Sequence, residues 1–325
     1  MISCKQKQLT FDRFAGYAQG STYNIIFENS IKTDPSGLKK QVDRIFRDFD
    51  KSVSVYDDSS LISMVNRNED VVLDTFFLEI LKRSNEISAE TNGAFDITVG
   101  PLVRAWGFGP DALKNFDVSK LDSILALIGY EKISVKDGHL VKKNPGMKID
   151  VNAIAQGYSA DVLYRYFSNL GLKNFLIEIG GEVRVRGAKN GDGWKIGIDK
   201  PEDNNDIPGA KLEAVIKLKD KALATSGSYR KFYIENGVKY SHEIDPETGY
   251  PAKNRLLSVS IIADECSTAD GLATACMVMG VEKTMAFIKD HTELEAYLIY
   301  SNEKGNFETW ATKKLRKSLN ENNPD

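Results

Sequence analysis

A carboxylate and a hydroxyl lie four residues apart in the segment CSTADGLAT, which covers residues 266–274. On a helix, Asp270 and Thr274 would share one face about one turn apart, so their oxygen atoms could bind one hard cation. The simpler explanation is a capping box, in which Ser267 caps the helix and Asp270 complements the positive charge of its N-terminus. Taken alone, the segment favours the capping explanation.

A second candidate segment runs from a short predicted strand at residues 148–151 into a predicted helix. Asp150 lies at the end of that strand, where binding residues often gather. Gly157 would lie in the first two turns of the helix, where glycine costs roughly 1 kcal/mol relative to alanine. Such a glycine indicates either the close approach of a bulky group or a tight helix–sheet contact, and the sequence leaves both open.

Two further segments carry residues that could take part in binding. His242 stands beside the turn-dense stretch at residues 245–251, where it could act as a general base or as a structural hydrogen-bonding group. A lone histidine is more often structural. The stretch at residues 93–110 is rich in glycine and aromatic residues, so it either lines a pocket for a flat ring or packs a core.

The motifs that the sequence lacks narrow the chemistry. There is no GxGxxG, no GxxxxGK[ST] and no GxSxG, so a bound nucleotide would need another geometry. The three cysteines form no CxxC pair and the three histidines are far apart in sequence. We therefore expect any bound metal to have oxygen ligands.

The 325 residues have an ordinary globular composition, with 42% hydrophobic and 27% charged residues. The length predicts one large domain or two lobes. The formal net charge of −3 argues against binding of a polyanion by bulk electrostatics, so we expect no nucleic-acid partner. No run reaches the roughly 18 apolar residues that a membrane-spanning helix needs.

The elements that must position these residues are strands and helices without a steady βαβ alternation, which predicts an α+β fold. The expected strands cover residues 21–28, 175–179, 182–186, 194–199, 212–218, 223–225, 255–263 and 296–300. The expected helices begin at the caps Asp34 and Asp74, within residues 57–66, and near residues 119, 153, 267 and 282. The residues from 313 onward are polar, and we expect them to be loose.

The first four residues, MISC, resemble the end of a bacterial lipobox, in which an aliphatic and a small residue precede a lipidated cysteine. In that interpretation Cys4 is the lipid anchor and the residues after it form a polar tether. The alternative is an ordinary N-terminus with an incidental cysteine, and these four residues alone do not separate the two.

Taken together, six segments resemble one family, the ApbE family of FAD:protein FMN transferases. They occur in the family's order: GAFDITVGPLV with WGFGP, KIDVNAIAQGYSAD, IEIGGEVRVRG, ALATSGSYRKF, SHEIDPETGYP and CSTADGLATA. The resemblance extends from about residue 20 to residue 280. It implies a two-lobed α+β architecture with a T-fold-like core over residues 19–312, between an N-terminal tether (1–18) and a polar C-terminal tail (313–325).

The resemblance also implies a reaction. Members bind FAD with Mg²⁺, cut its pyrophosphate, release AMP and attach FMN through its phosphate to a Thr or Ser of a partner protein. Some members instead hydrolyse FAD to FMN and AMP. Tyr56 resembles the aromatic residue of the transferring members and favours transfer. Hydrolysis and non-catalytic flavin binding stay open.

The family's functional residues map onto this sequence one by one. The resemblance assigns metal binding to Asp270, to Thr274 and to the backbone carbonyl of Ala153. It assigns the catalytic base to His242. It places contacts with FAD at Tyr56, Ala94, Phe95, Asp96, Asp150, Gln156 and Ile244. Three places depart from many members: Gln19 stands in place of Met, Asn152-Ala153 in place of a pair that contains Gly or Ser, and Gln156 in place of Lys or Glu.

Members are typically exported bacterial lipoproteins. The resemblance therefore implies a protein on the periplasmic side of a bacterial membrane, with Cys4 as its lipid anchor and no other membrane attachment. It implies that the acceptor is a flavin-carrying subunit of a membrane redox complex.

Overall fold

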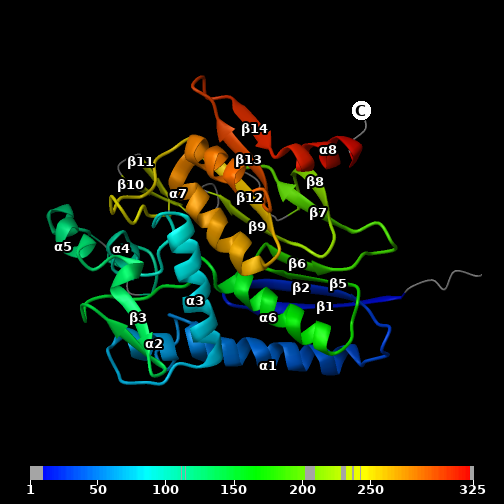
Figure 1. Cartoon of the computed structure of the whole chain (residues 1–325), viewed down its shortest axis with the longest axis horizontal. Helices are drawn as coiled ribbons and strands as arrows, with labels where there is room; N and C mark the ends of the chain where they lie inside the picture. Colours follow the sequence, from blue (N-terminus) through cyan, green and yellow to red (C-terminus); the bar gives the residue numbers. More distant parts are fainter. Residues whose placement is uncertain are drawn as a thin grey trace, which may run out of the picture.

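The computed structural model describes residues 10–110, 112–113, 115–201, 209–227, 232–235, 238–241 and 243–322. Its centre is an eight-stranded sheet in the order β1-β2-β5-β6-β9-β12-β13-β14, in which every neighbouring pair is antiparallel (Figure 1). These strands are β1 (Phe11–Ala18), β2 (Ser21–Glu28), β5 (Phe175–Ile179), β6 (Glu182–Arg186), β9 (Ala222–Gly227), β12 (Leu256–Ala263), β13 (Glu295–Ser301) and β14 (Phe307–Ala311). The mixed α+β class predicted from the sequence is confirmed.

Helices and three small hairpins surround the large sheet. The helices are α1 (Pro35–Val53), α2 (Leu61–Asn66), α3 (Thr75–Glu90), α4 (Gly100–Ala105), α5 (Leu121–Leu125), α6 (Ala155–Asn169), α7 (Cys266–Asp290) and α8 (Lys313–Asn322), with short 3₁₀ turns η1 (Val118–Lys120) and η2 (Tyr130–Lys132). The hairpins are β3–β4 (Ile133–Lys136, His139–Lys142), β7–β8 (Trp194–Asp199, Leu212–Leu218) and β10–β11 (Phe232–Glu235, Val238–Ser241).

The large sheet consists of two similar halves. In each half two strands lead into a helix, and two more strands follow it: β1, β2, α6, β5 and β6 in one, and β9, β12, α7, β13 and β14 in the other. The halves join at the β6–β9 pair. Figure 1 shows α6 and α7 on one face of the sheet, meeting near its middle and running away in opposite directions.

Apolar clusters fill both sides of the sheet. On the helical side, α1 and α6 cover the first half around Phe27 and Phe167, and α3 and α7 cover the second half around Phe77 and Leu272. On the other side, the β7–β8 hairpin and α8 bury Trp194 and Leu315. Burial on both faces explains why β5 (FLIEI) and β12 (LLSVSIIA) are mostly apolar.

Several helix starts follow the local capping rules predicted from the sequence. The Asp34 carboxylate accepts hydrogen bonds from the backbone N–H groups of Ser36 and Gly37 at 3.1 and 2.9 Å, at the start of α1. Asp74 accepts from the backbone N–H of Phe77 at 2.9 Å and so caps α3. These caps satisfy backbone donors that would otherwise lack a helical partner.

The structure differs from the sequence-based expectations at both ends of the chain. Residues 11–18, expected to lie in a tether, form the edge strand β1 and pair with β2. Residues 313–322, expected to lie in a loose polar tail, form α8, and its Leu315 is only 2% exposed. The expected strand at residues 148–151 is reduced to one isolated bridge between Val99 and Lys148.

Helix α7 is apolar as well as long, with a mean hydropathy of 1.3 over its most apolar stretch. By length and composition it could cross a membrane, contrary to the expectation from the sequence. More than half of that stretch is buried within the protein, as expected for a core helix. Its backbone breaks at Gly280, where φ is 76°, and this matches the expected division into two helical segments.

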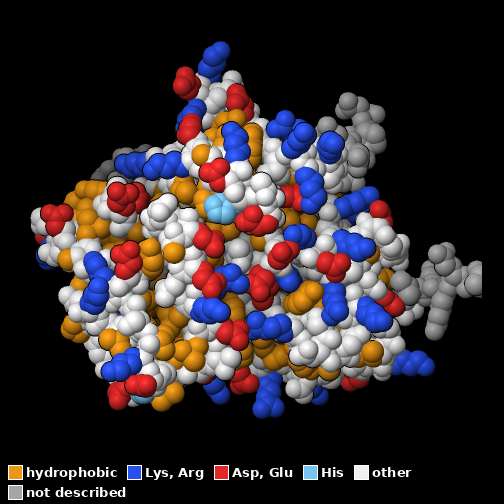
Figure 2. Space-filling model, viewed as in Figure 1, with side chains coloured by type: hydrophobic (Ala, Val, Ile, Leu, Met, Phe, Trp, Pro, Cys, Tyr) orange, Lys and Arg blue, Asp and Glu red, His pale blue; other side chains and the backbone are white. Residues whose placement is uncertain are grey.

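Charged side chains of both signs are interspersed over the face of the molecule seen in Figure 2. No large region of that face carries a single sign of charge.

Candidate active site

Helices α6 and α7 meet at the residues that the sequence analysis selected for chemistry. The backbone N–H of Gly157 donates a hydrogen bond to Oδ2 of Asp270 at 2.9 Å. A Cβ atom on Gly157 would lie 2.6 Å from the Cys266 carbonyl oxygen and 2.7 Å from Cβ of Asp270. Glycine is therefore required by a tight helix–helix contact, and not by the helix–sheet contact that the sequence left open.

The same contact changes the surroundings of Ala153, which lies in the turn before α6. In a regular helix the N–H of Gly157 would donate to the carbonyl of Ala153, but here it donates to Asp270. Within the part of the chain that the structure describes, no backbone N–H donates to the Ala153 carbonyl. That oxygen is left available to another ligand.

Thr274 completes a group of oxygen donors. It follows Asp270 by one turn of α7, is half-buried, and its hydroxyl makes no hydrogen bond to any described residue. A carbonyl, a carboxylate and a hydroxyl suit Mg²⁺, which prefers oxygen ligands and keeps several waters. The described residues contain no cluster of three or more His, Cys, Asp or Glu side chains able to hold a metal. The group built around Asp270 is therefore the candidate metal site.

The predicted flavin contacts at residues 94–96 lie beside α7 but have structural partners. Phe95 is 2% exposed and packs in the same apolar cluster as Leu272, with Ala94 at its edge. Asp96 accepts hydrogen bonds from the N–H and hydroxyl of Thr98, both at 2.7 Å, and from the N–H of Tyr130 at 2.8 Å. Burial raises the pKa of Asp96 above its usual range, although these hydrogen bonds oppose the shift.

Asp150 and Tyr56 lie near each other. The N–H of Asp150 donates to the carbonyl of Ile97 at 2.8 Å, which ties this segment to the Phe95–Asp96 loop. Burial of its carboxylate raises the pKa of Asp150. Partial burial and the nearby Asp150 carboxylate raise the pKa of Tyr56, whose side chain is nevertheless 67% exposed. Tyr56 thus presents an open aromatic ring beside a carboxylate.

Two of the positions that depart from the family pattern, Gln19 and Gln156, contact each other. The amide of Gln156 donates weakly to the carbonyl of Gln19 at 3.5 Å, and the hydroxyl of Ser159 lies 3.3 Å from Oε1 of Gln19. A Cβ atom on Gly180 would lie 2.6 Å from Nε2 of Gln156. Gln156 therefore packs between the β1–β2 turn and the β5–β6 turn, next to the start of α6.

Ile244 lies in a separate apolar cluster with Leu102 and Trp106. The indole N–H of Trp106 donates to the Gly249 carbonyl at 2.7 Å, which fixes the following loop against α4. His242, the predicted base, lies outside the described residues, as does Cys4.

The structure thus places the Asp270 carboxylate against the start of α6, four residues after Ala153, with Thr274 one turn further along α7 and Gln156 next to Gly157 in the chain. Tyr56 and Asp150 form a second pair, while Ile244 belongs to the cluster around Trp106. Sequence reasoning missed that the carboxylate of Asp270 reaches across to α6. The signal for it was Gly157, an N-terminal helical glycine with no local explanation.

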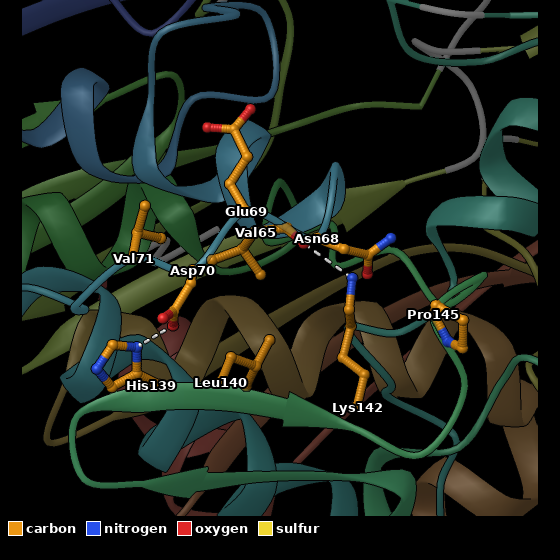
Figure 3. A pocket seen from close by; sticks show the side chains of 9 residues that line it. All are labelled: Val65, Asn68, Glu69, Asp70, Val71, His139, Leu140, Lys142 and Pro145. Atoms are coloured by element: carbon orange, nitrogen blue, oxygen red, sulfur yellow. Dashed lines mark hydrogen bonds and ion pairs between the residues drawn. The ribbon is translucent and has the colours of Figure 1, made fainter.

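A distinct hollow of about 240 Å³ opens beside the β3–β4 hairpin (Figure 3). His139 pairs with Asp70 there at 2.8 Å, and the ammonium of Lys142 donates to the carbonyl of Val65 at 2.8 Å. None of the predicted site residues lines this hollow. Because the predicted site residues lie elsewhere, this hollow is not the candidate active site.

The fold and the site define the class of protein, because solved flavin transferases share this architecture over their full length. The solved flavin transferase ApbE from Vibrio cholerae superposes with a TM-score of 0.86 at 34% identity, covering 96% of this chain and 100% of that one. The apo flavinyl transferase ApbE of Pseudomonas stutzeri gives a TM-score of 0.85 at 30% identity, with coverages of 96% and 97%.

Sequence comparison gives the family. The FAD:protein FMN transferase of Vibrio cholerae is 35% identical over 312 residues, which cover 94% of this chain and 92% of that protein. The enzyme of the same name from Haemophilus influenzae is 32% identical over 317 residues, with coverages of 94% and 90%. The model of the ApbE family matches residues 19–298. The chain belongs to the ApbE family.

Proposed function

We propose that this chain is a Mg²⁺-dependent FAD:protein FMN transferase, which moves FMN from FAD to a Thr or Ser hydroxyl of an acceptor protein and releases AMP. Relatives of that name align with more than nine-tenths of the chain and support the overall reaction. The observation that carries the metal-dependent form is the hydrogen bond from Gly157 to Asp270, because it frees the Ala153 carbonyl beside a buried carboxylate.

The reaction replaces a phosphoanhydride bond with a phosphoester bond. The acceptor oxygen forms a bond to the phosphorus on the FMN side of the FAD pyrophosphate. The bond from that phosphorus to the bridging oxygen breaks, and AMP leaves with the electron pair. The hydroxyl proton passes to a base, and FMN stays attached to the acceptor through its phosphate.

The residues of this chain bind the groups that the reaction needs. Ala153, Asp270 and Thr274 would hold Mg²⁺, which neutralises pyrophosphate charge and makes AMP a better leaving group when it is bound. The carboxylate of Asp270 is fixed at the α6 N-terminus, so the site is positioned before substrate arrives. The exposed ring of Tyr56 offers a flat surface for the flavin.

The proton acceptor in this proposal is His242. A neutral imidazole is available near pH 7 and can take the proton of an attacking hydroxyl. We expect His242→Ala to reduce transfer and to leave FAD binding largely intact. Transfer at the wild-type rate in that variant would mean that His242 is structural.

Transfer, hydrolysis and simple flavin binding are separated by their products. Purified protein is mixed with FAD, Mg²⁺ and an acceptor domain with an exposed Thr, and both AMP and in-gel flavin fluorescence are measured. We expect AMP and a fluorescent acceptor band, both lost with EDTA or with Asp270→Ala. AMP with free FMN and no band would indicate hydrolysis. FAD binding without either product would indicate a flavin-binding protein.

A matched control for Asp270→Ala is Asp264→Ala. Asp264 precedes α7, is paired with Lys221 on the surface and has an 80% exposed side chain. Because an exposed ion pair contributes little, we expect Asp264→Ala to keep the wild-type rate of transfer.

We also propose that the protein works on the periplasmic side of a bacterial membrane, anchored through lipidated Cys4, and that its acceptor is a flavin-carrying subunit of a membrane redox complex. The basis is the MISC segment and the family resemblance. Labelled fatty acid should be incorporated into the exported chain in cells and lost with Cys4→Ser. Equal labelling of both chains would contradict the anchor.

A further inference from the structure

Each of the helices α6 and α7 supplies an aspartate carboxylate that accepts hydrogen bonds at the N-terminal end of the other helix. While Asp270 of α7 accepts from the N–H of Gly157 in α6, Asp161 of α6 reaches the first turn of α7. It accepts hydrogen bonds from the N–H groups of Cys266 and Ser267, both at 2.9 Å, and from the Ser267 hydroxyl at 2.8 Å.

The exchange follows a two-fold pattern in the sequence. The segments GYSAD (157–161) and CSTAD (266–270) place the contacted residue first and the aspartate last. Residue 157 meets residue 270, and residue 161 meets residue 266, so the two segments run antiparallel. This pairing joins the two halves of the sheet at equivalent positions of their helices.

Neither helix has a local cap. The cap positions are Ile154 before α6 and Glu265 before α7, and neither side chain makes a capping hydrogen bond. Instead, the N–H of Gly157 in α6 and the N–H groups of Cys266 and Ser267 in α7 each bond a carboxylate from the other helix. Because the carboxylate that contacts α7 belongs to α6, its hydrogen bonds fix the start of α7 relative to α6.

The surroundings of Asp161 allow it to stay in that place. It is 6% exposed, and Nη1 of Arg184 lies 3.6 Å from its Oδ1. The guanidinium of Arg184 also lies 4.2 Å from the centre of the Tyr164 ring. Burial raises the pKa of Asp161, whereas Arg184 and the α7 donors favour the ionised form.

We propose that Asp161 is a positioning residue of the metal site, which fixes the first turns of α7 so that Asp270 and Thr274 face the Ala153 carbonyl. This inference rests on the proposed function. The metal ligands come from two elements: Ala153 precedes α6, and the other two lie on α7. Two cross-helix links connect those elements, and Asp161 supplies one of them through three hydrogen bonds.

The variant Asp161→Asn tests this role, because it keeps the size of the side chain and replaces one acceptor oxygen with an amide donor. The probe is Mn²⁺ alone, with free Mn²⁺ measured by electron paramagnetic resonance in the absence of FAD. Residues that orient metal ligands typically change affinity by about 10- to 100-fold when they are mutated. We expect that weakening in Asp161→Asn and a nearly complete loss of binding in Asp270→Asn.

A kinetic measurement separates positioning from general damage. With FAD and an acceptor, Asp161→Asn should need about 10- to 100-fold more Mg²⁺ for half-maximal rate. At saturating Mg²⁺ its maximal rate should return to within about threefold of the wild type. A merely structural loss would lower the maximal rate at every Mg²⁺ concentration.

Two further variants keep the test decisive. Ser267→Ala removes only the hydroxyl hydrogen bond to Asp161, so it should fold and show a smaller weakening of Mn²⁺ affinity. Glu79→Gln disrupts another α6 contact, in which Glu79 bonds Tyr158 and Arg165. We expect its Mn²⁺ affinity to stay within twofold of the wild type.

The outcomes distinguish this inference from the proposed function. Wild-type Mn²⁺ affinity in folded Asp161→Asn and Ser267→Ala, with Asp270→Asn still defective, would overturn the role of Asp161 alone. If the wild-type protein binds no Mn²⁺, or if Asp270→Asn binds it normally, the metal site fails and this inference fails with it.

Discussion

The N-termini of α6 and α7 meet in the middle of the sheet. Each N-terminus contacts an aspartate of the other helix, but the two aspartates have different surroundings. Each N-terminus concentrates positive partial charge, so their approach would be unfavourable without nearby anions. At α7, Asp161 accepts three hydrogen bonds and lies beside the cation of Arg184. At α6, Asp270 accepts from Gly157 and leaves the Ala153 carbonyl without a helical donor.

The residues one turn further along each helix sharpen this difference. Arg165 follows Asp161 by four residues, and it bonds Glu79 and Tyr158 at the surface. Thr274 follows Asp270 by four residues and offers an uncharged hydroxyl. The Asp161 carboxylate therefore has the cation of Arg184 beside it, whereas the helix that carries Asp270 presents a further oxygen atom one turn on. Of two helix ends built from similar residues, the one at Asp161 thus fixes the contact between the helices, and the one at Asp270 forms the candidate metal site.

The largest effect is expected from Gly157→Ala, which would force the two helix ends apart. The added methyl group would lie 2.6 Å from a backbone oxygen, which cannot move away as a side chain could. We expect a loss of about 3 kcal/mol in the free energy of unfolding, measured with urea. Transfer of FMN should be lost as well, because Asp270 and Ala153 would separate.

The matched control for Gly157→Ala is Gly37→Ala in α1. Both glycines lie in the first turn of a helix and donate their N–H to an aspartate at 2.9 Å. At Gly37 the nearest atom to the added methyl group is a carboxylate oxygen of Asp34, 3.2 Å away on a side chain. We expect Gly37→Ala to be neutral or to stabilise by up to about 1 kcal/mol. Equal destabilisation by both changes would contradict the role given to the α6–α7 contact.

The difference between these two glycines also explains what the sequence could predict. The caps at Asp34 and Asp74 were predictable because donor and acceptor are separated by at most three residues. The partners of Gly157 and Cys266 lie 113 and 105 residues away along the chain. No local pattern specifies such a contact. Once the contact is known, GYSAD and CSTAD can be seen to follow one pattern, with the contacted residue first and the aspartate last.

Strand β1 shows a second limit of local reasoning. Its segment FDRFAGYA contains Gly16, and glycine is depleted in strands. In the structure Gly16 pairs with Tyr23, and a Cβ atom there would lie 2.6 Å from the Tyr23 ring. The glycine makes room for an aromatic ring on the neighbouring strand, which only the paired structure reveals. Helix α8 was missed for a similar reason, since its polar sequence hides one buried anchor, Leu315.

A smaller effect is expected from Arg184→Met, which removes the cation beside Asp161 at the N-terminus of α7. Breaking a fully buried ion pair costs about 3–5 kcal/mol, but this pair is 3.6 Å apart and Asp161 keeps three donors. We therefore expect a loss of about 2 kcal/mol in the free energy of unfolding at pH 8.

The sign of the pH dependence tests that explanation. The folded-state pKa of Asp161 is already raised by burial, and removing Arg184 should raise it further. Above that pKa the variant bears the cost of a buried, uncompensated carboxylate. As the pH falls through it, the folded state takes up a proton before the unfolded state does, and part of the stability returns. Urea titrations at pH 8 and pH 5 should therefore show a larger defect at pH 8. An equal defect at both values would mean that the loss comes from packing against Tyr164.

The smallest effect on stability is expected from Thr274→Val, at the candidate metal site. This change keeps the shape of the side chain and removes the hydroxyl. Because the hydroxyl has no hydrogen bond to a described residue, stability should change by less than about 0.5 kcal/mol. Loss of one of the three proposed oxygen ligands should instead raise the Mg²⁺ concentration for half-maximal transfer by about tenfold, as weakened metal sites do. Mg²⁺ titration of the initial rate of AMP release measures this shift, and a melting curve of the same preparation measures stability.

The control is Thr284→Val on the same helix, whose buried hydroxyl bonds the carbonyl of Cys276 at 3.1 Å. That variant should lose stability and keep the wild-type Mg²⁺ dependence. The reverse result, with Thr274→Val changing only stability, would show that both ends of the α6–α7 contact are structural.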